Sequence, residues 1–130
     1  MSVQLSAPEP LSSEHRLDEF ECGEPVLDEW LRRRALSNQL SGGSRTFVVV
    51  DQDKRVFGYY AMAAGAIAHQ MATSSVRRNM PDPIPAILLS RLAVDRSEQG
   101  KGLGAQLLRD AITRCVAVAD LIGVRVMLVH

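Results

Sequence analysis

Three glycines at alternate positions, Gly100, Gly102 and Gly104, stand between a polar turn and a long segment with helical spacing of its apolar residues. Glycine has no Cβ, so its backbone N–H groups can approach an anion closely. The start of a helix adds unpaired N–H donors and the positive end of the helix dipole. These residue types therefore predict a loop over residues 99–105 that binds a diphosphate.

Other glycine-loop chemistries fit this segment less well. A Walker A loop needs Ser or Thr directly after its Gly-Lys pair, whereas Gly102 follows Lys101. The spacing Gly100-x-Gly102-x-x-Ala105 fits the dinucleotide fingerprint. However, it lies late in the chain, and no strand-ending acidic residue follows about 20 residues on. A glycine turn that only lets a strand pack on a helix stays open as a structural alternative.

The elements around this loop follow from the apolar pattern. The most apolar strand is expected over Ile87 to Val94, interrupted only by Ser90 and Arg91. The recurring apolar residues from Leu108 to Ile122 predict a helix of several turns. Gly123 is expected to cap this helix, and a buried strand is expected over 124–129.

Earlier in the chain, the pattern predicts a strand, a helix, a hairpin and a loop. The strand begins at Val3 to Leu5, and one amphipathic helix runs from Pro25 to Leu40 and stops at Ser41-Gly42-Gly43. Thr46 to Val50 and Val56 to Ile67 form an antiparallel hairpin, on which Tyr59 and Tyr60 point to opposite faces. Residues 69–85, with three prolines, are expected to form a loop.

Composition limits the class of protein. A chain of 130 residues with 46% hydrophobic residues predicts one domain with one core. Since no apolar run approaches the roughly 18 residues of a membrane span, we expect a cytoplasmic protein without membrane contact. Cys22 and Cys115 have no partners at metal-binding spacing, so no zinc site is expected. Cys115 falls on an apolar stripe and is expected in the core.

Charge is unevenly distributed along the chain. Residues 1–30 carry eight acids and one base, and the remaining hundred residues carry fourteen bases and seven acids. Thirteen of the fifteen bases are arginines, which bind phosphate with a bidentate fork. A face that binds a polyanion and an ordinary solvated surface both fit this pattern.

The segment Gln99-x-x-Gly102-x-Gly104, with Asp95 before it and an amphipathic helix after it, resembles the acetyl-CoA signature of the GNAT acetyltransferases. The resemblance implies an α/β (α+β) GNAT fold, in which a mixed and mostly antiparallel sheet is flanked by helices. It implies that the strand residues Leu92, Ala93 and Val94 pair with pantetheine. It also implies that the pyrophosphate is held by the backbone amides of the loop, namely Gln99, Gly100, Lys101, Gly102, Leu103, Gly104 and Ala105.

A narrower resemblance covers residues 11–130. Segments 20–31, 58–61, 77–81 and 91–95 are similar to GNAT toxins of type II toxin–antitoxin pairs. Those enzymes acetylate the α-amine of aminoacyl-tRNA without a metal ion, which implies an aminoacyl-tRNA substrate, a DNA-binding antitoxin partner and a homodimer. Arginines on the early helix and on the proline loop are then candidates for tRNA phosphate contacts: Arg32, Arg33 and Arg34, with Arg77 and Arg78.

In these toxins a tyrosine that follows the last predicted strand protonates the departing thiolate. The resemblance therefore places the catalytic tyrosine beyond His130 and implies a single GNAT domain over residues 1–130 that lacks its last strands. Tyr59 and Tyr60 lie on the hairpin and do not match this position. Two alternatives stay open: an acetyltransferase of a small-molecule or protein amine, and an inactive CoA-binding remnant.

Overall fold

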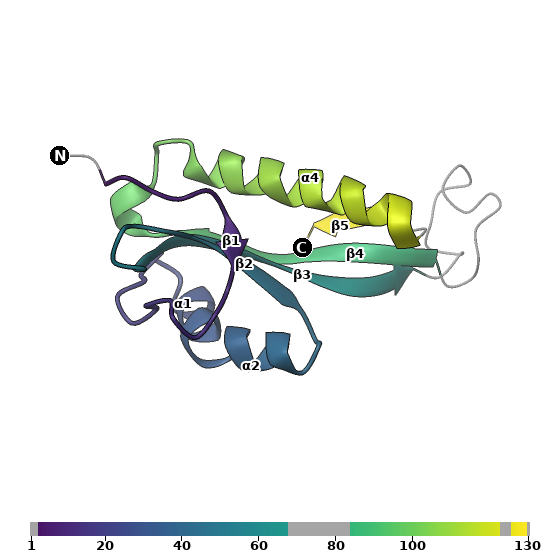
Figure 1. Cartoon of the computed structure of the whole chain (residues 1–130), viewed down its shortest axis with the longest axis horizontal. Helices are drawn as coiled ribbons and strands as arrows, with labels where there is room; N and C mark the ends of the chain where they lie inside the picture. The colour runs from purple at the N-terminus through teal and green to yellow at the C-terminus, as the bar shows by residue number, and fades with distance from the viewer. Residues whose placement is uncertain (1–2, 68–83, 123–125, 130) are drawn as a thin grey trace.

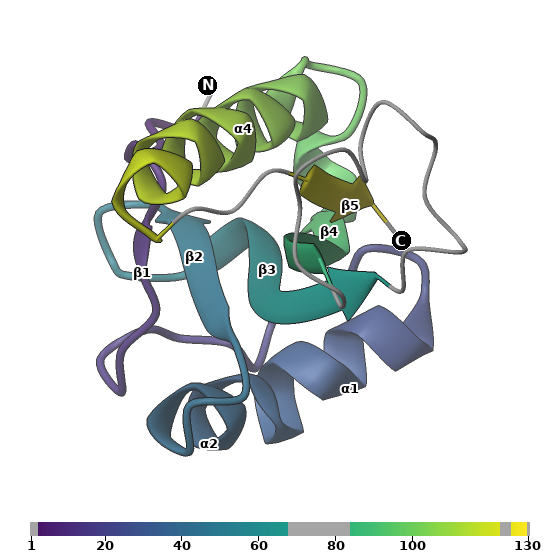
Figure 2. The ribbon, with the colours of Figure 1, turned by 90° about the vertical axis from the view of Figure 1, so that its right-hand side faces the viewer.

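The computed structural model describes residues 3–67, 84–122 and 126–129. Five strands form one sheet in the order β1-β2-β3-β4-β5. Helices α1 and α2 cover one face of this sheet and the long helix α4 covers the other (Figures 1 and 2). The elements are β1 (Glu9–Pro10), α1 (Pro25–Arg33), α2 (Ala35–Leu40), β2 (Arg45–Val50), β3 (Val56–Ile67), β4 (Ile84–Val94), a 3-10 turn (Arg96–Glu98), α4 (Leu103–Ile122) and β5 (Val126–Val129).

The predicted hairpin is confirmed. β2 and β3 pair antiparallel, with Phe47 opposite Tyr60. Asp51 closes the turn because its carboxylate accepts hydrogen bonds from the amides of Asp53 and Arg55, at 2.9 and 3.0 Å. Such a side-chain-to-backbone pairing is typical of Asp at the first position of a turn.

The two tyrosines divide the core into two layers, as the alternation of a strand requires. Tyr59 packs against Trp30 on the α1 face, and Tyr60 stacks on Phe47 on the α4 face with a centroid distance of 5.2 Å. Cys115 is buried with 7% of its surface exposed, which confirms its place in the core.

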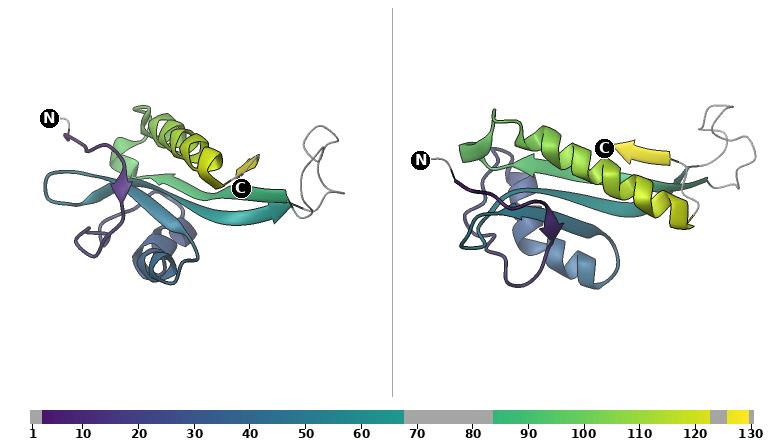
Figure 3. Two further views of the ribbon diagram at one scale, coloured as in Figure 1. Left: turned by 45° about the vertical axis from the view of Figure 1, so that its right-hand side comes forward. Right: turned by 45° about the horizontal axis from the view of Figure 1, so that its top comes forward.

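β4 has two different neighbours. It pairs with β3 antiparallel along its whole length, whereas β5 pairs with it in parallel only at residues 86–89. The β3–β4 register shifts at Ala61 and Met62, which leaves Ser90 as a bulged residue of β4. Residues 90–94 of β4 therefore have no strand partner, within the described residues, on the edge that faces away from β3 (Figure 3).

The prediction of one helix over Pro25–Leu40 was wrong. The helix breaks at Arg34, whose φ of −125° lies outside the helical range. Long-range contacts of α2 explain the break: the Gln39 side chain donates to the Leu11 carbonyl at 2.8 Å and accepts from the Thr46 amide at 2.9 Å. The expected stop is confirmed, since α2 ends at Leu40 and Gly42 has a positive φ of 84°.

The expected strand at Val3–Leu5 was also wrong. The first strand, β1, forms later because Glu9 and Pro10 are the residues that lie opposite Val48 and Phe47 of β2. Pro10 is tolerated there because β1 is an edge strand. The loop expected over 69–85 was wrong at its end, because Ile84 and Pro85 pair with β3 as the first residues of β4. Residues 69–83 of that loop and the cap expected at Gly123 lie outside the described residues.

Helix α4 lies close to the sheet because Gly58 of β3 has no side chain. A Cβ at Gly58 would stand 3.1 Å from Leu107 and 3.2 Å from Leu103. Leu103 and Leu107 are both buried, so this contact fixes the first turns of α4 against β3 and β4. In the described part of the chain, no helix has both the length and the apolar character needed to cross a membrane.

Candidate functional site

The turn before the glycine loop is anchored by Asp95, the residue that follows β4. Asp95 is buried, and its carboxylate accepts hydrogen bonds from the Ser97 amide at 3.1 Å and the Ser97 hydroxyl at 2.7 Å. It also accepts from the amide of Glu21 at 2.9 Å, and the Arg96 amide donates to the Glu21 carbonyl at 2.8 Å. This carboxylate therefore joins the end of β4 to the segment before α1.

The Gln99 side chain forms a second anchor. Its amide nitrogen Nε2 donates to the Cys22 carbonyl at 2.7 Å and to the Val94 carbonyl at 2.9 Å. The backbone amide of Gln99 donates to the Arg96 carbonyl at 3.4 Å. Gln99 thus contributes to the shape of the loop through both its side chain and its backbone.

The glycines in the loop are required by backbone conformation. Gly100 and Gly102 have φ values of 78° and 87°, and a Cβ at either position would meet no atom within 4 Å. A non-glycine residue at these φ values is strained, because Cβ approaches the backbone carbonyl. The open space beside both glycines allows a ligand to approach the backbone closely.

The start of α4 supplies free donors. The first hydrogen bond inside this helix runs from the Gln106 amide to the Gly102 carbonyl at 3.1 Å. The amides of residues 102–105 therefore have no carbonyl within the helix to bind. Lys101, whose Nζ lies 3.1 Å from Glu98 Oε2, adds a partly neutralised cation. Together, these groups form an anion site that fits a pyrophosphate.

The strand residues Leu92, Ala93 and Val94 lead into this loop along the edge of β4 that has no strand partner in the described chain. Leu92 packs on the α4 face and Ala93 on the α1 face. The Val94 carbonyl already accepts from Gln99, so its bond to Gln99 competes with any bond to a ligand. The structure thus brings together all ten residues expected to hold the cofactor.

Comparison with known proteins agrees with this geometry. Residues 13–128 match the family described as an acetyltransferase (GNAT) domain. The chain is 60% identical over 125 residues to a tRNA-acetylating toxin of Mycobacterium tuberculosis, covering 96% of this chain and 75% of that protein. The chain belongs to the GNAT acetyltransferases.

Two solved structures resemble this GNAT chain along almost its whole length. AtaT complexed with acetyl-methionyl-tRNAfMet has a TM-score of 0.87 at 26% identity and covers 97% of this chain and 77% of its own. A mutant of the toxin AtaT, bound to the C-terminus of the antitoxin AtaR and acetyl-CoA, has a TM-score of 0.81 at 26% identity. That match covers 96% of this chain and 74% of AtaT. These similarities confirm the predicted GNAT fold.

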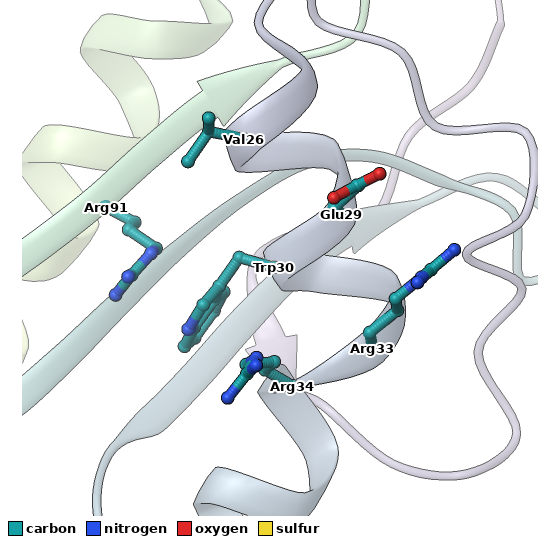
Figure 4. A pocket seen from close by; sticks show the side chains of 6 residues that line it. All are labelled: Val26, Glu29, Trp30, Arg33, Arg34 and Arg91. Carbon is teal, nitrogen blue, oxygen red and sulfur yellow. The ribbon is translucent and has the colours of Figure 1, made fainter.

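The arginines expected to bind tRNA occupy different environments in this GNAT domain. Arg32 donates to the Phe20 carbonyl at 2.7 Å and lines a cavity of about 580 Å³ rich in carboxylates. Arg33 lines a separate cavity of about 280 Å³, here called the arginine pocket, formed by Val26, Glu29, Trp30, Arg33, Arg34 and Arg91 (Figure 4). Arg77 and Arg78 lie outside the described residues.

The only two tyrosines of the sequence, Tyr59 and Tyr60, bind to other parts of the fold through their hydroxyls. The Tyr59 hydroxyl donates to the Leu27 carbonyl at 2.8 Å, and the Tyr60 hydroxyl donates to Asp110 at 2.5 Å. Burial raises the pKa of both phenols above their ordinary value. These contacts leave neither hydroxyl free to act as a proton donor at the edge of β4.

The Cys22 thiol and the possible metal-binding side chains are two other places where chemistry could occur. Burial, and next the hydrogen bond to Asp28, raise the pKa of the Cys22 thiol to about 11, so the unreactive thiol form dominates. Across residues 3–67, 84–122 and 126–129, no cluster of His, Cys, Asp or Glu side chains is suited to a metal ion. The glycine loop and the arginine pocket are the candidate binding sites of the described chain.

Sequence reasoning missed the pairing of Trp30 with Arg91. The Arg91 guanidinium lies 4.2 Å from the centroid of the Trp30 ring. One signal was available, because Arg91 is a charged residue inside the most apolar strand of the chain. A charge at such a position is rare unless it is paired or functional.

Proposed function

We propose that this chain uses acetyl-CoA to acetylate the α-amine of aminoacyl-tRNA, and that it acts as a toxin by blocking translation. The 60% identity to a tRNA-acetylating toxin carries this proposal, because that match spans nearly the whole chain. The loop with positive-φ glycines supports it, since it supplies the anion site that a CoA pyrophosphate needs.

Each part of the site has a proposed role. The amides of residues 99–105 hold the pyrophosphate, and Leu92, Ala93 and Val94 hold the pantetheine arm through backbone groups. Bound acetyl-CoA supplies the acetyl group as a thioester. Arg32, Arg33, Arg77 and Arg78 are proposed to contact tRNA phosphates, with Arg33 the better placed of the first two because Arg32 is bound to a carbonyl.

The proposal extends to partners and location. The likeness to AtaT, seen bound to the antitoxin AtaR, supports an antitoxin partner for this chain. We further propose that residues 1–130 form one GNAT domain, that the protein forms homodimers and that it acts in the cytoplasm, where charged tRNA is found. That antitoxin is proposed to bind DNA.

The test is transfer of labelled acetyl groups from acetyl-CoA to aminoacyl-tRNA by a chain extended past His130 to include the predicted tyrosine. Deacylated tRNA, free amino acids and small amines are the comparison substrates. We expect label only on aminoacyl-tRNA, in a form that base-catalysed ester hydrolysis releases as an N-acetyl amino acid. Equal labelling of small amines would favour the small-molecule alternative. Acetyl-CoA binding without any transfer would favour a CoA-binding remnant.

A further inference from the structure

The arginine pocket lies between α1 and β4 (Figure 4). Three of its lining side chains are arginines, and one, Glu29, is a carboxylate, so the lining is positive. Within the described residues, Arg33, Arg34 and Arg91 form no ion pair with an acidic side chain. Arginines that line one cavity without a carboxylate partner favour an anionic ligand.

Trp30 and Arg91 give the pocket a flat surface. The Arg91 guanidinium lies over the indole at 4.2 Å, and the Tyr59 ring stacks on the same indole at 6.0 Å and 14°. Since only 9% of Trp30 is exposed, an incoming ring meets the guanidinium rather than the indole. A guanidinium plane held in this way is a surface on which an RNA base can stack.

The pocket lies beside the strand residues that are proposed to hold pantetheine. Arg91 directly follows the bulged residue Ser90 and directly precedes Leu92, the first residue proposed to hold pantetheine. This part of β4 is the edge without a strand partner in the described chain. A substrate in the pocket can therefore present an amine at the same edge without crossing the sheet.

We propose that the arginine pocket binds the 3′-terminal nucleotides of the RNA acceptor. The terminal base stacks on the Arg91 guanidinium, which Trp30 supports, and the adjoining phosphates lie against Arg33 and Arg34. Glu29 opposes the phosphates and limits their affinity. This inference rests on the proposed function and deepens it, because it assigns the acceptor end to named side chains.

Trp30 is the single tryptophan of the chain, so tryptophan fluorescence reports directly on this site. The RNA trinucleotide CCA is titrated against the full chain while intrinsic fluorescence is recorded. Saturating acetyl-CoA is present throughout, so that the trinucleotide cannot occupy the cofactor loop. We expect saturable quenching, and a lower affinity for the same sequence lacking its terminal adenosine.

Variants separate stacking from charge. Arg91→Lys keeps the charge but removes the plane, and Arg91→Met removes both. Loss of one stacked base typically reduces affinity by roughly 5- to 100-fold, so we expect both variants to fall in that range. Arg33→Glu should weaken binding and reduce its salt dependence, Glu29→Gln should strengthen it, and Arg109→Glu on the exposed side of α4 should leave it unchanged. Unchanged affinity for acetyl-CoA in each variant shows that the fold is retained.

Three results would overturn the proposal: no quenching by CCA, wild-type affinity in Arg91→Met, or wild-type affinity in Arg91→Lys. The last would reduce the role of Arg91 to charge alone. Acetyl transfer to intact aminoacyl-tRNA is measured in parallel with a chain extended past His130 to include the predicted tyrosine. If transfer is normal while CCA does not bind, the pocket assignment fails and the proposed function stands. If CCA binds while transfer is absent, the proposed function fails and the pocket remains an RNA-binding site.

Discussion

The glycine loop and the arginine pocket flank the same edge of β4, but they are built from different parts of the chain. The loop presents backbone amides from one continuous segment, whose shape depends on two positive-φ glycines. The pocket presents side chains from α1 and β4, which are brought together only by the fold. The loop should therefore be sensitive to changes in backbone conformation, and the pocket to changes in side chains.

The largest effect is expected at Gly102. Gly102→Asp adds a side chain at φ 87° and a negative charge beside the pyrophosphate, so acetyl-CoA affinity should fall by about 100-fold or more. Isothermal titration calorimetry measures this. The matched control is Gly42→Asp, at φ 84° and also without neighbours within 4 Å, which should share the backbone strain and keep the affinity. Equal affinities in the two variants would place the cofactor elsewhere.

Asp95→Ala should show that the loop depends on its anchor. It removes the acceptor of three hydrogen bonds, so the free energy of unfolding should drop by about 2–4 kcal/mol. Acetyl-CoA affinity should fall as well. Asp51→Ala also removes the acceptor of two backbone amides, but in the β2–β3 turn, and should destabilise without changing affinity. Urea unfolding and calorimetry measure both quantities, and an unchanged affinity in folded Asp95→Ala would contradict the prediction.

Arg77→Glu with Arg78→Glu should weaken tRNA binding by roughly tenfold and leave acetyl-CoA binding unaltered. If each arginine contacts one phosphate, the slope of log affinity against log salt should flatten by about one per residue. Filter binding at several salt concentrations measures the slope. A slope identical to that of the wild type would remove both residues from the interface.

A smaller effect should distinguish the two neighbouring arginines of α1. Arg33→Ala should lower tRNA affinity by roughly 3- to 10-fold and flatten the salt slope, because its side chain lines the arginine pocket. Arg32→Ala should instead lower stability by about 1 kcal/mol through loss of its bond to the Phe20 carbonyl, with little change in the slope. A flatter salt slope in Arg32→Ala but not in Arg33→Ala would show that the tRNA approaches the carboxylate-rich cavity lined by Arg32.

The smallest effect on catalysis is expected at Tyr59. Tyr59→Phe removes one hydrogen bond to the Leu27 carbonyl and should cost about 1 kcal/mol of stability while leaving the acetylation rate unchanged. Tyr60→Phe should behave similarly with a larger loss of stability, since its acceptor is the Asp110 carboxylate, which Arg114 also binds. A rate reduced by a hundredfold or more in either variant would make that tyrosine the proton donor.

Much of the fold was readable from the sequence where local patterns agree with long-range packing. The hairpin, the apolar strand β4 and helix α4 each show the apolar periodicity of their own type of element. Gly100 and Gly102 mark a loop whose backbone needs positive φ. The placement of the catalytic tyrosine beyond His130 stays a prediction.

The remainder depends on contacts between distant segments. The break at Arg34 has no glycine or proline to mark it, and the contacts of Gln39 with Leu11 and Thr46 account for it. The stacking of Arg91 on Trp30 depends on which face of β4 meets α1. Periodicity indicates that such a face exists but does not identify its partner.

The anchors of Asp95 and Gln99 have a consequence for the irregular segment just before α1. The amides of Glu21 and Cys22 each donate to a carboxylate at 2.9 Å, and the carbonyls of the same two residues each accept a bond from the turn after β4. Amide deuteration in such a segment requires that these bonds open together. Glu21 and Cys22 should therefore exchange at the slow rate of β3, although their local sequence resembles that of an exposed connection.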